Sequence, residues 1–484
     1  MHCRSFIDGV WVESATQPVA LGNPADSRQI VSRTQHATPE TAAKAVAVAA
    51  NAWRGWRRTP RERRVAVLEE LLLSIGDNRG ALALAISSET GKTKAEADQE
   101  VDATLNEARI QIGVFNSVCN DRGDIGNTGT IGEDRRTLYE PLGAVLLVTP
   151  FNFPLAAVMR KLVPALLLGN GVVVKASELT PATSCRLFDL IDSGGLPRGV
   201  VNLVLADGRT VVRRMLDVEG IAAVSLTGSN AAGDAVAAAI GARDVRLQAE
   251  MGGSNAVVVL RDADLDAAAA AIVEHGFACC GQWCTGTTRI IIDAPAYDEM
   301  LGLLADRIGT IVVGPADNPA ATMGPLISAS QRQRVEAAIA VLTESGARLV
   351  CGGKRPEGEE FAHGYFLEPT LLADIEDQSA LCRQEIFGPV LAVVKAESRD
   401  DALRKANEGP YGLSFSIYTS DLRTAEAFVD EVDCGLCHIN LPTGHRHSAM
   451  PLAGWKTSGR GMPECGRFAL NFFSRTKAVY CASR

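Results

Sequence analysis

The sequence lacks the apolar segments that a membrane span or a secretion signal requires. The stretch closest to a membrane span, residues 142–159, is interrupted by Pro150 and Pro154, and a spanning helix would leave backbone groups at these breaks unsatisfied. The N-terminus holds no apolar core of a signal peptide. We therefore expect a protein that contacts no membrane and works in the cytoplasm.

Concentrated charge and a disulfide framework are also absent. The net charge of −9 is spread along the chain rather than gathered in a tail, which argues against nucleic acid as the main partner. The 12 cysteines lie in a chain of 484 residues, and without a secretion signal they indicate free thiols in a reducing compartment.

Cys434-x-x-Cys437 has the spacing of a redox or metal-binding motif. It overlaps a strand-like run, residues 435–440, and no second pair of ligands at zinc-site spacing accompanies it. We expect two packed thiols there and no metal site.

The length of the chain predicts two or three domains, because one hydrophobic core stops growing well below 484 residues. Residues 38–114 have a helical pattern, with helices that begin at Thr38-Pro39 and Thr59-Pro60. A polar, glycine-rich stretch over 120–134 and the alternating residues 137–139 then predict a hairpin-like excursion.

Strands and helices alternate after this excursion. Short apolar strands joined through helices predict parallel sheets with helices on both faces, and therefore an α/β fold. Two such units meet near residues 250–254, and the alternating end of the chain predicts an edge strand that pairs with the hairpin or with another subunit. The predicted strands are 144–148, 172–175, 200–205, 222–226, 256–260, 289–292, 390–394, 413–418, 435–440 and 472–481, and the predicted helices of the first unit are 155–168, 180–193, 209–217 and 230–240.

The usual Gly-x-Gly-x-x-Gly dinucleotide fingerprint is missing from the first unit. In its place, Thr227-Gly228-Ser229 joins a strand to a helix with Gly233 in its first turn. Free N–H groups at such a helix start suit a pyrophosphate. The alternative is that Ser229 only caps the helix.

Lys175 and Glu178 lie at or just past the end of another strand, at the rim where open α/β sheets bind ligands. A carboxylate there can accept hydrogen bonds from ribose hydroxyls. The alternative is a surface salt bridge.

Cys284 lies among small residues, between Gly281 and Gly286. Such a site lets a ligand approach the sulfur, and a thiohemiacetal formed there can lose hydride and leave a thioester. The alternative is an inert buried cysteine. Cys279 and Cys280 fall on a helical run, where we expect them to be packing residues.

Glu250 precedes a glycine pair, Gly252-Gly253. A carboxylate with freedom to move suits a general base, and the alternative is a plain turn residue.

In their order along the chain, these segments and three others resemble the NAD(P)-dependent aldehyde dehydrogenase superfamily, and the resemblance extends from about Phe6 to Tyr480. The matching segments are Thr149-Pro150-Phe151-Asn152-Phe153-Pro154, Lys175-Ala176-Ser177-Glu178, Thr227-Gly228-Ser229, Glu250-Met251-Gly252-Gly253, Gly281-Gln282-x-Cys284, Glu385-Ile386-Phe387-Gly388-Pro389 and Pro451-Leu452-Ala453-Gly454-x-Lys456-x-Ser458-Gly459.

The resemblance implies a role for each matching residue. Cys284 is the expected nucleophile, Glu250 the base that activates the deacylating water, and Asn152 the side-chain donor to the oxyanion. The cofactor is expected to be NAD, with NADP as an alternative, because the Glu178 carboxylate would repel a 2′-phosphate. The expected cofactor contacts are Lys175, Glu178, Ser229, Gly228, Thr149, Phe151, Glu385 and Phe387.

The resemblance also implies the architecture: two doubly wound α/β domains and a β-hairpin oligomerisation arm, assembled as a homodimer or homotetramer. Residues 1–118 and 138–249 would form the dinucleotide-binding domain, and residues 250–440 the catalytic domain. Residues 119–137 and 463–484 would form the arm.

The substrate is less tightly defined. Arg160 lies on the helix expected to face the substrate channel, where several semialdehyde dehydrogenases carry an arginine that meets a substrate carboxylate. Residues 439–443 and 463–473 also resemble the α-ketoglutarate-semialdehyde branch, so we expect a semialdehyde such as that of succinate or α-ketoglutarate. Alternatives are an aromatic aldehyde as the substrate and a surface ion pair as the role of Arg160.

Two rival functions remain. Glu250 argues against an acylating, coenzyme A-dependent enzyme, which generally lacks that carboxylate. Cys284, Glu250 and Asn152 together argue against a catalytically idle nucleotide-binding member of the family.

Overall fold

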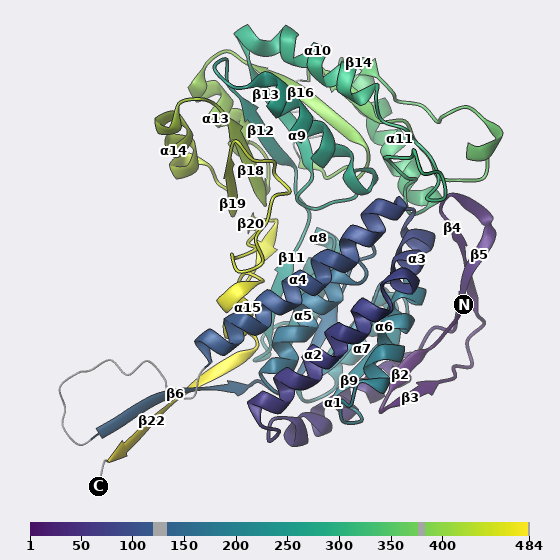
Figure 1. Cartoon of the computed structure of the whole chain (residues 1–484), viewed down its shortest axis with the longest axis vertical. Helices are drawn as coiled ribbons and strands as arrows, with labels where there is room; N and C mark the ends of the chain where they lie inside the picture. The colour runs from purple at the N-terminus through teal and green to yellow at the C-terminus, as the bar shows by residue number, and fades with distance from the viewer. Residues whose placement is uncertain (120–132, 376–382, 483–484) are drawn as a thin grey trace.

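The structure, a computed structural model, describes residues 1–119, 133–375 and 383–482. Figure 1 shows two α/β units stacked one above the other and a thin two-stranded arm that projects from the lower unit. None of the described helices is long and apolar enough to cross a membrane.

The N-terminal part supplies short strands and the helices of the lower unit. Helix α1 follows the N-cap Thr38, whose side chain accepts a hydrogen bond from the Thr41 N–H. The elements are β1 (His2–Cys3), β2 (Ser5–Ile7), β3 (Val10–Val12), β4 (Val19–Asn23), β5 (Asp26–Thr34), α1 (Pro39–Trp56), α2 (Arg61–Asp77), α3 (Arg79–Thr90) and α4 (Lys94–Val118).

The first predicted alternation is confirmed. Its strands join a sheet of order β21-β11-β10-β7-β8-β9-β2-β3, in which β11, β10, β7, β8 and β9 are parallel neighbours. The elements are β7 (Ala144–Val148), α5 (Ala156–Leu167), β8 (Gly171–Ala176), α6 (Pro181–Ser193), β9 (Val201–Leu205), α7 (Gly208–Asp217), β10 (Ile221–Thr227), α8 (Asn230–Ile240), β11 (Arg246–Glu250) and β21 (Gly459–Arg460).

Both faces of this sheet are covered, as expected for a doubly wound fold. Val145 and Leu147 of β7 pack with helices α2, α4, α5 and α6, whereas Ala144 and Leu146 pack with α1, α7 and α8. Successive strand residues point to opposite faces, so each strand contributes to two cores.

The upper unit holds a second sheet, of order β14-β15-β16-β13-β12-β18-β19, parallel except for the β14–β15 pair. One continuous core fills this unit. Its elements are β12 (Asn255–Val259), α9 (Leu265–Phe277), β13 (Thr287–Asp293), α10 (Tyr297–Ile308), α11 (Ala329–Glu344), β14 (Arg348–Cys351), β15 (Thr370–Ala373), β16 (Val390–Ala396), α13 (Arg399–Asn407), β17 (Tyr411–Gly412), β18 (Ser414–Tyr418), α14 (Leu422–Glu431), β19 (Leu436–Ile439) and β20 (Trp455–Lys456).

The arm consists of β6 (Glu133–Pro141) and β22 (Ser474–Ala482), which pair antiparallel along their whole lengths. This confirms that the C-terminal strand pairs with the earlier excursion; residues 120–132 of the predicted hairpin lie outside the described residues. Helix α15 (Gly466–Phe472) is not part of the arm, because its Leu470 and Phe472 are buried in the lower core.

One local expectation was wrong. Cys279 and Cys280 do not continue a helix, because α9 ends at Phe277 and both cysteines adopt left-handed backbone conformations, with φ of 54° and 56°. They are buried, as predicted for packing residues, but in a tight turn that leads to Cys284.

Asn170 connects three segments of the lower unit. Its side-chain oxygen accepts hydrogen bonds from the N–H groups of Leu142 and Gly143, at 2.8 and 3.2 Å. Its side-chain nitrogen donates to the carbonyls of Ala165 and Phe473, at 3.0 and 2.9 Å. The fully buried Asn170 therefore joins the start of β7 to the end of α5 and to the root of β22.

We predict that Asn170→Ala destabilises the protein by about 2 to 4 kcal/mol, because it leaves buried backbone groups without partners. The measurement is the shift of the unfolding midpoint in urea. Asn78→Ala is the control, since Asn78 is exposed; equal shifts for the two variants would contradict this role of Asn170.

Candidate active site

The carboxyl ends of β8, β7, β10 and β11 lie at one edge of the lower sheet and open into a cleft of about 780 Å³. This volume is typical of a ligand site, and such an edge is where open α/β sheets bind ligands. Every residue predicted to contact the cofactor lines this cleft, together with Asn152 and Cys284: Thr149, Phe151, Lys175, Glu178, Gly228, Ser229, Glu385 and Phe387.

The outer part of the cleft contains the start of α8. The Ser229 hydroxyl accepts a hydrogen bond from the Ala232 N–H at 3.3 Å, so Ser229 caps the helix and also lines the cleft. A Cβ at Gly233 would lie 2.3 Å from Met251 Sδ, which explains the glycine in the first turn. Helix α8 therefore presents its positive end to the cleft.

Lys175 and Glu178 form an ion pair with 3.0 Å between Nζ and Oε2. The lysine is buried and the glutamate side chain is 36% exposed. The salt bridge that was the alternative interpretation of these residues is thus present. It lies in the wall of the cleft, where both groups can reach a ligand.

Glu385 lies against the glycine pair that follows β11. Its Oε1 accepts a hydrogen bond from the Gly253 N–H at 3.2 Å, and a Cβ at Gly252 would lie only 2.2 Å from its Oε2. The glycines are therefore required for this close approach, a reason that the sequence alone did not reveal. Burial raises the pKa of Glu385 to about 7.

Cys284 lines the same cleft and is partly exposed. The turn before it depends on Gly281, which has a φ of +67° and whose Cβ would lie 2.0 Å from the Gly388 carbonyl oxygen. Burial raises the pKa of the Cys284 thiol to about 11. The negative charge of Glu385 raises this pKa further, whereas the positive charges of Arg160 and Arg446 lower it.

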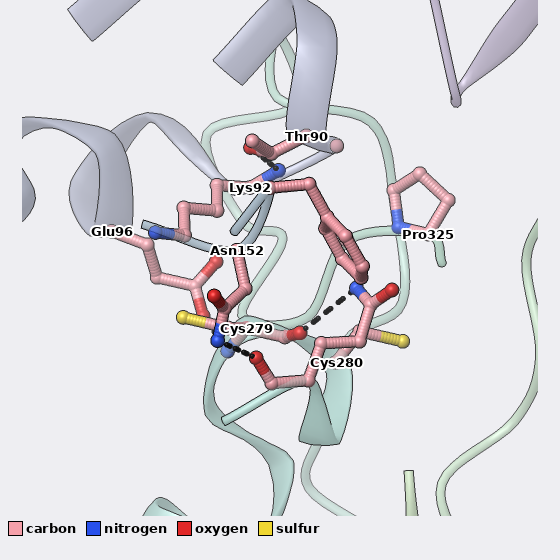
Figure 2. Close-up of a pocket in the computed structure, with 11 residues that line it drawn as sticks. Thr90, Lys92, Glu96, Asn152, Cys279, Cys280 and Pro325 are labelled. Atoms are coloured by element: carbon pink, nitrogen blue, oxygen red, sulfur yellow. Dashed lines mark hydrogen bonds between the residues drawn. The ribbon is translucent and has the colours of Figure 1, made fainter. Parts of the chain in front are cut away.

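Asn152 is held next to this turn by a chain of hydrogen bonds (Figure 2). Its Nδ2 donates to the Gln282 carbonyl at 2.8 Å, and the Gln282 side chain donates to the Cys279 carbonyl at 3.2 Å. The cavity behind these residues measures about 10 Å³, which is too small for a substrate. The Asn152 amide is therefore held by hydrogen bonds, and Asn152 also lines the larger cleft, which has room for a ligand.

Glu250 ends β11, in register with Thr227, and its Oε2 is buried without a partner in the described residues. Burial raises its pKa well above the ordinary value, and the nearby Glu464 carboxylate raises it further. Glu464 itself pairs with the buried Lys161. A carboxyl group whose pKa is raised suits a general base.

A family model described as the aldehyde dehydrogenase family matches residues 11–479. The chain is 34% identical to an α-ketoglutarate semialdehyde dehydrogenase of Haloferax volcanii, over 99% of this chain and 98% of the relative. Among solved structures, a lactaldehyde dehydrogenase is 32% identical with a TM-score of 0.93, covering 100% of this chain and 99% of the other. A betaine aldehyde dehydrogenase from Staphylococcus aureus, in complex with NAD+, is 29% identical with a TM-score of 0.92, covering 99% and 95%.

The chain belongs to the aldehyde dehydrogenase family.

As a member of this family, the protein is an oxidoreductase, and the expected fold is confirmed. The structure adds residues to the site of this aldehyde dehydrogenase that the motifs did not single out. They are the buried Lys161–Glu464 pair, Glu107, which contacts Arg160, and Arg446, which contacts Glu107. Gln282, which was part of the Cys284 motif without an assigned role, fixes Asn152. Of these residues, Lys161 had a signal in the sequence, because it and Arg160 are the two charged residues of a helix that is otherwise apolar.

Arg160 forms an ion pair, but the pair is not on the surface. Its Nε lies 2.8 Å from Glu107 Oε1, and the two side chains are 13% and 8% exposed. Removal of a charge pair from water requires good geometry, and Arg160 meets this requirement with two hydrogen bonds to the Glu107 carboxylate.

We predict that Cys284 in the free aldehyde dehydrogenase reacts with iodoacetamide at a rate that rises with pH up to about pH 11, because only the thiolate reacts. Glu385→Gln should lower the apparent pKa, since it removes a negative charge that opposes the thiolate. Peptide-resolved mass spectrometry measures the reaction, with the exposed Cys481 as the internal control. A midpoint for Cys284 below about 8.5, the value of a free thiol, would contradict this account.

Proposed function

We propose that this aldehyde dehydrogenase oxidises an aldehyde to the carboxylic acid with NAD(P), through a thioester on Cys284 that water hydrolyses. The observation that carries this proposal is that Cys284 and Asn152 line the same cleft as Lys175, Glu178 and Ser229. Glu250 lies close enough for its charge to raise the pKa of the Cys284 thiol.

The residues of the cleft fit a dinucleotide. Lys175 and Glu178 would bind the adenosine ribose, the start of α8 the pyrophosphate, and Glu385 the nicotinamide ribose. NAD supplies the oxidant when bound, because it accepts a hydride from the carbon attached to Cys284. The Glu178 carboxylate favours NAD over NADP, since it would repel a 2′-phosphate.

Cys284 and Asn152 act on the carbonyl group. Because the thiol has a raised pKa, its proton must pass to water as the sulfur attacks the aldehyde carbon. The Asn152 amide then donates a hydrogen bond to the oxygen that gains negative charge. One such donor typically lowers a barrier by about 3 kcal/mol.

Glu250 then directs the thioester to hydrolysis. It takes a proton from a water molecule, the water oxygen bonds to the acyl carbon, and the Cys284 sulfur leaves. This role distinguishes the proposed enzyme from an acylating one, in which coenzyme A would take the place of water.

A semialdehyde is the proposed substrate class. The Haloferax relative is described as an α-ketoglutarate semialdehyde dehydrogenase, and Arg160 supplies a cation close enough to affect Cys284. An aromatic aldehyde is the second candidate, because Phe153, which follows Asn152, packs against Trp283, which precedes Cys284, with ring centroids 5.9 Å apart.

The arm supports assembly into a homodimer or homotetramer. Most β22 residues are exposed, and an isolated two-stranded ribbon is only marginally stable in water. A second subunit that covers the arm would supply the missing contacts.

The described cysteines are free thiols, including Cys434 and Cys437, which fits the proposed location in a reducing cytoplasm.

We predict that the purified protein reduces NAD in the presence of short aldehydes and does so faster than it reduces NADP. Cys284→Ala should lower the rate by about 10⁴-fold or more, since it removes the nucleophile, whereas Cys351→Ala, at the edge of the second sheet, should leave it unchanged. The absorbance of the reduced cofactor is the readout, without coenzyme A. Undiminished activity of Cys284→Ala would overturn the proposal, and strict dependence on coenzyme A would indicate an acylating enzyme.

A further inference from the structure

Two arginines share one carboxylate beside the proposed nucleophile. Arg160 Nε and Nη2 donate to Glu107 at 2.8 and 3.3 Å, and Arg446 Nη1 and Nη2 donate to the same carboxylate at 3.4 and 3.2 Å. Arg160 is on α5, Glu107 is on α4, and Arg446 is in the loop after β19. This Arg160–Glu107–Arg446 cluster therefore joins three segments that are distant in the sequence.

The cluster carries an uncompensated positive charge. Two guanidinium groups and one carboxylate sum to +1, because the arginines lower the pKa of Glu107 to about 2 and keep it ionised. The neighbouring Cys465 thiol is neutral, since its pKa is raised to about 12, and Glu464 already pairs with Lys161. An unbalanced charge in a largely buried place is costly, so the cluster suits an anionic ligand.

The cluster lies one side chain away from Cys284. Cys465 Sγ contacts Glu107 Oε1 and accepts a hydrogen bond from Arg446 Nη1, both at 3.4 Å. On its other side, Cys465 belongs to the small apolar cluster of Leu413 and Leu452, against which Cys284 packs. A molecule that reacts at Cys284 is therefore bound about one side chain away from the arginines.

The arginines also retain donors for such a molecule. Arg160 Nη1 and Arg446 Nε have no hydrogen-bond partner among the described residues. Both atoms are accessible to solvent. The Arg160 and Arg446 side chains are 13% and 23% exposed, so both reach an accessible space.

We propose that Arg446 is a specificity-determining residue, which acts with Arg160 to bind a carboxylate at the end of the substrate remote from the aldehyde group. This inference rests on the proposed function and assigns to Glu107 the positioning of both guanidinium groups. A carboxylate bound there would balance the charge of the cluster, while the apolar patch of Leu413, Leu452 and Cys465 would contact the chain between the two ends.

The test compares succinate semialdehyde with its methyl ester, which has the same chain and no charge. Arg446→Gln should raise the KM for the acid by about 10- to 100-fold, the effect of one or two charge-assisted hydrogen bonds, and change kcat/KM for the ester by less than about threefold. The KM of Arg446→Lys for the acid should fall between the values for the wild type and for Arg446→Gln. Arg423→Gln, on the exposed surface of α14, is the matched control and should leave KM and kcat/KM unchanged for both substrates.

A binding measurement supports the kinetics without the cofactor. Succinate should slow alkylation of Cys284 in the wild type and protect it much less in Arg446→Gln. Equal losses of kcat/KM with the acid and with the ester would overturn the inference, because Arg446 would then act on the Cys284 thiolate or on the fold. An unchanged preference for the acid would also overturn it. A wild type that oxidises neither aldehyde would instead contradict the proposed function, and succinate protection would still report on the cluster.

Discussion

The alignment of parallel strand ends is the constraint on which the rest of the site depends. Val148 is in register with Lys175 on one side and with Leu226 on the other, and Thr227 is in register with Glu250. Because these strands run in the same direction, the segments that follow them emerge at one edge of the sheet. This single geometric fact brings the ribose-binding pair, the start of α8 and the Asn152 loop to one cleft, and it places the proposed base next to Met251 and Gly252 in the wall of that cleft.

A second organising feature is the distribution of charge around Cys284. On one side, Glu464 pairs with Lys161, whereas the nearby Glu250 has a raised pKa that suits proton transfer. On the other side, Arg160 and Arg446 share Glu107, which leaves an excess cation. The adjacent residues Arg160 and Lys161 of α5 serve the two sides. One helix thus separates the groups that handle protons from the groups that attract an anion.

The sequence predicted the local elements and the motif residues well, because both depend on short-range patterns. The strand over 144–148 and the helix over 230–240 match their predicted bounds, and all predicted cofactor contacts line one cleft. Contacts between distant segments could not be predicted: Glu107 and Arg446 are 339 residues apart, and Asn152 and Gln282 are 130 apart. The left-handed turn at Cys279 and Cys280 was also missed, since its small and apolar residues continue a helical pattern.

The most direct test of the central claim, that Glu250 admits water to a thioester on Cys284, is mass spectrometry of Glu250→Gln mixed with NAD and an aldehyde. The account predicts a burst of about one equivalent of reduced cofactor per active site and a Cys284 peptide heavier by the acyl group. The adduct should persist, because the base for its hydrolysis is missing, while the wild type shows no accumulation. Steady turnover by Glu250→Gln at the wild-type rate, with no adduct on Cys284, would contradict the account.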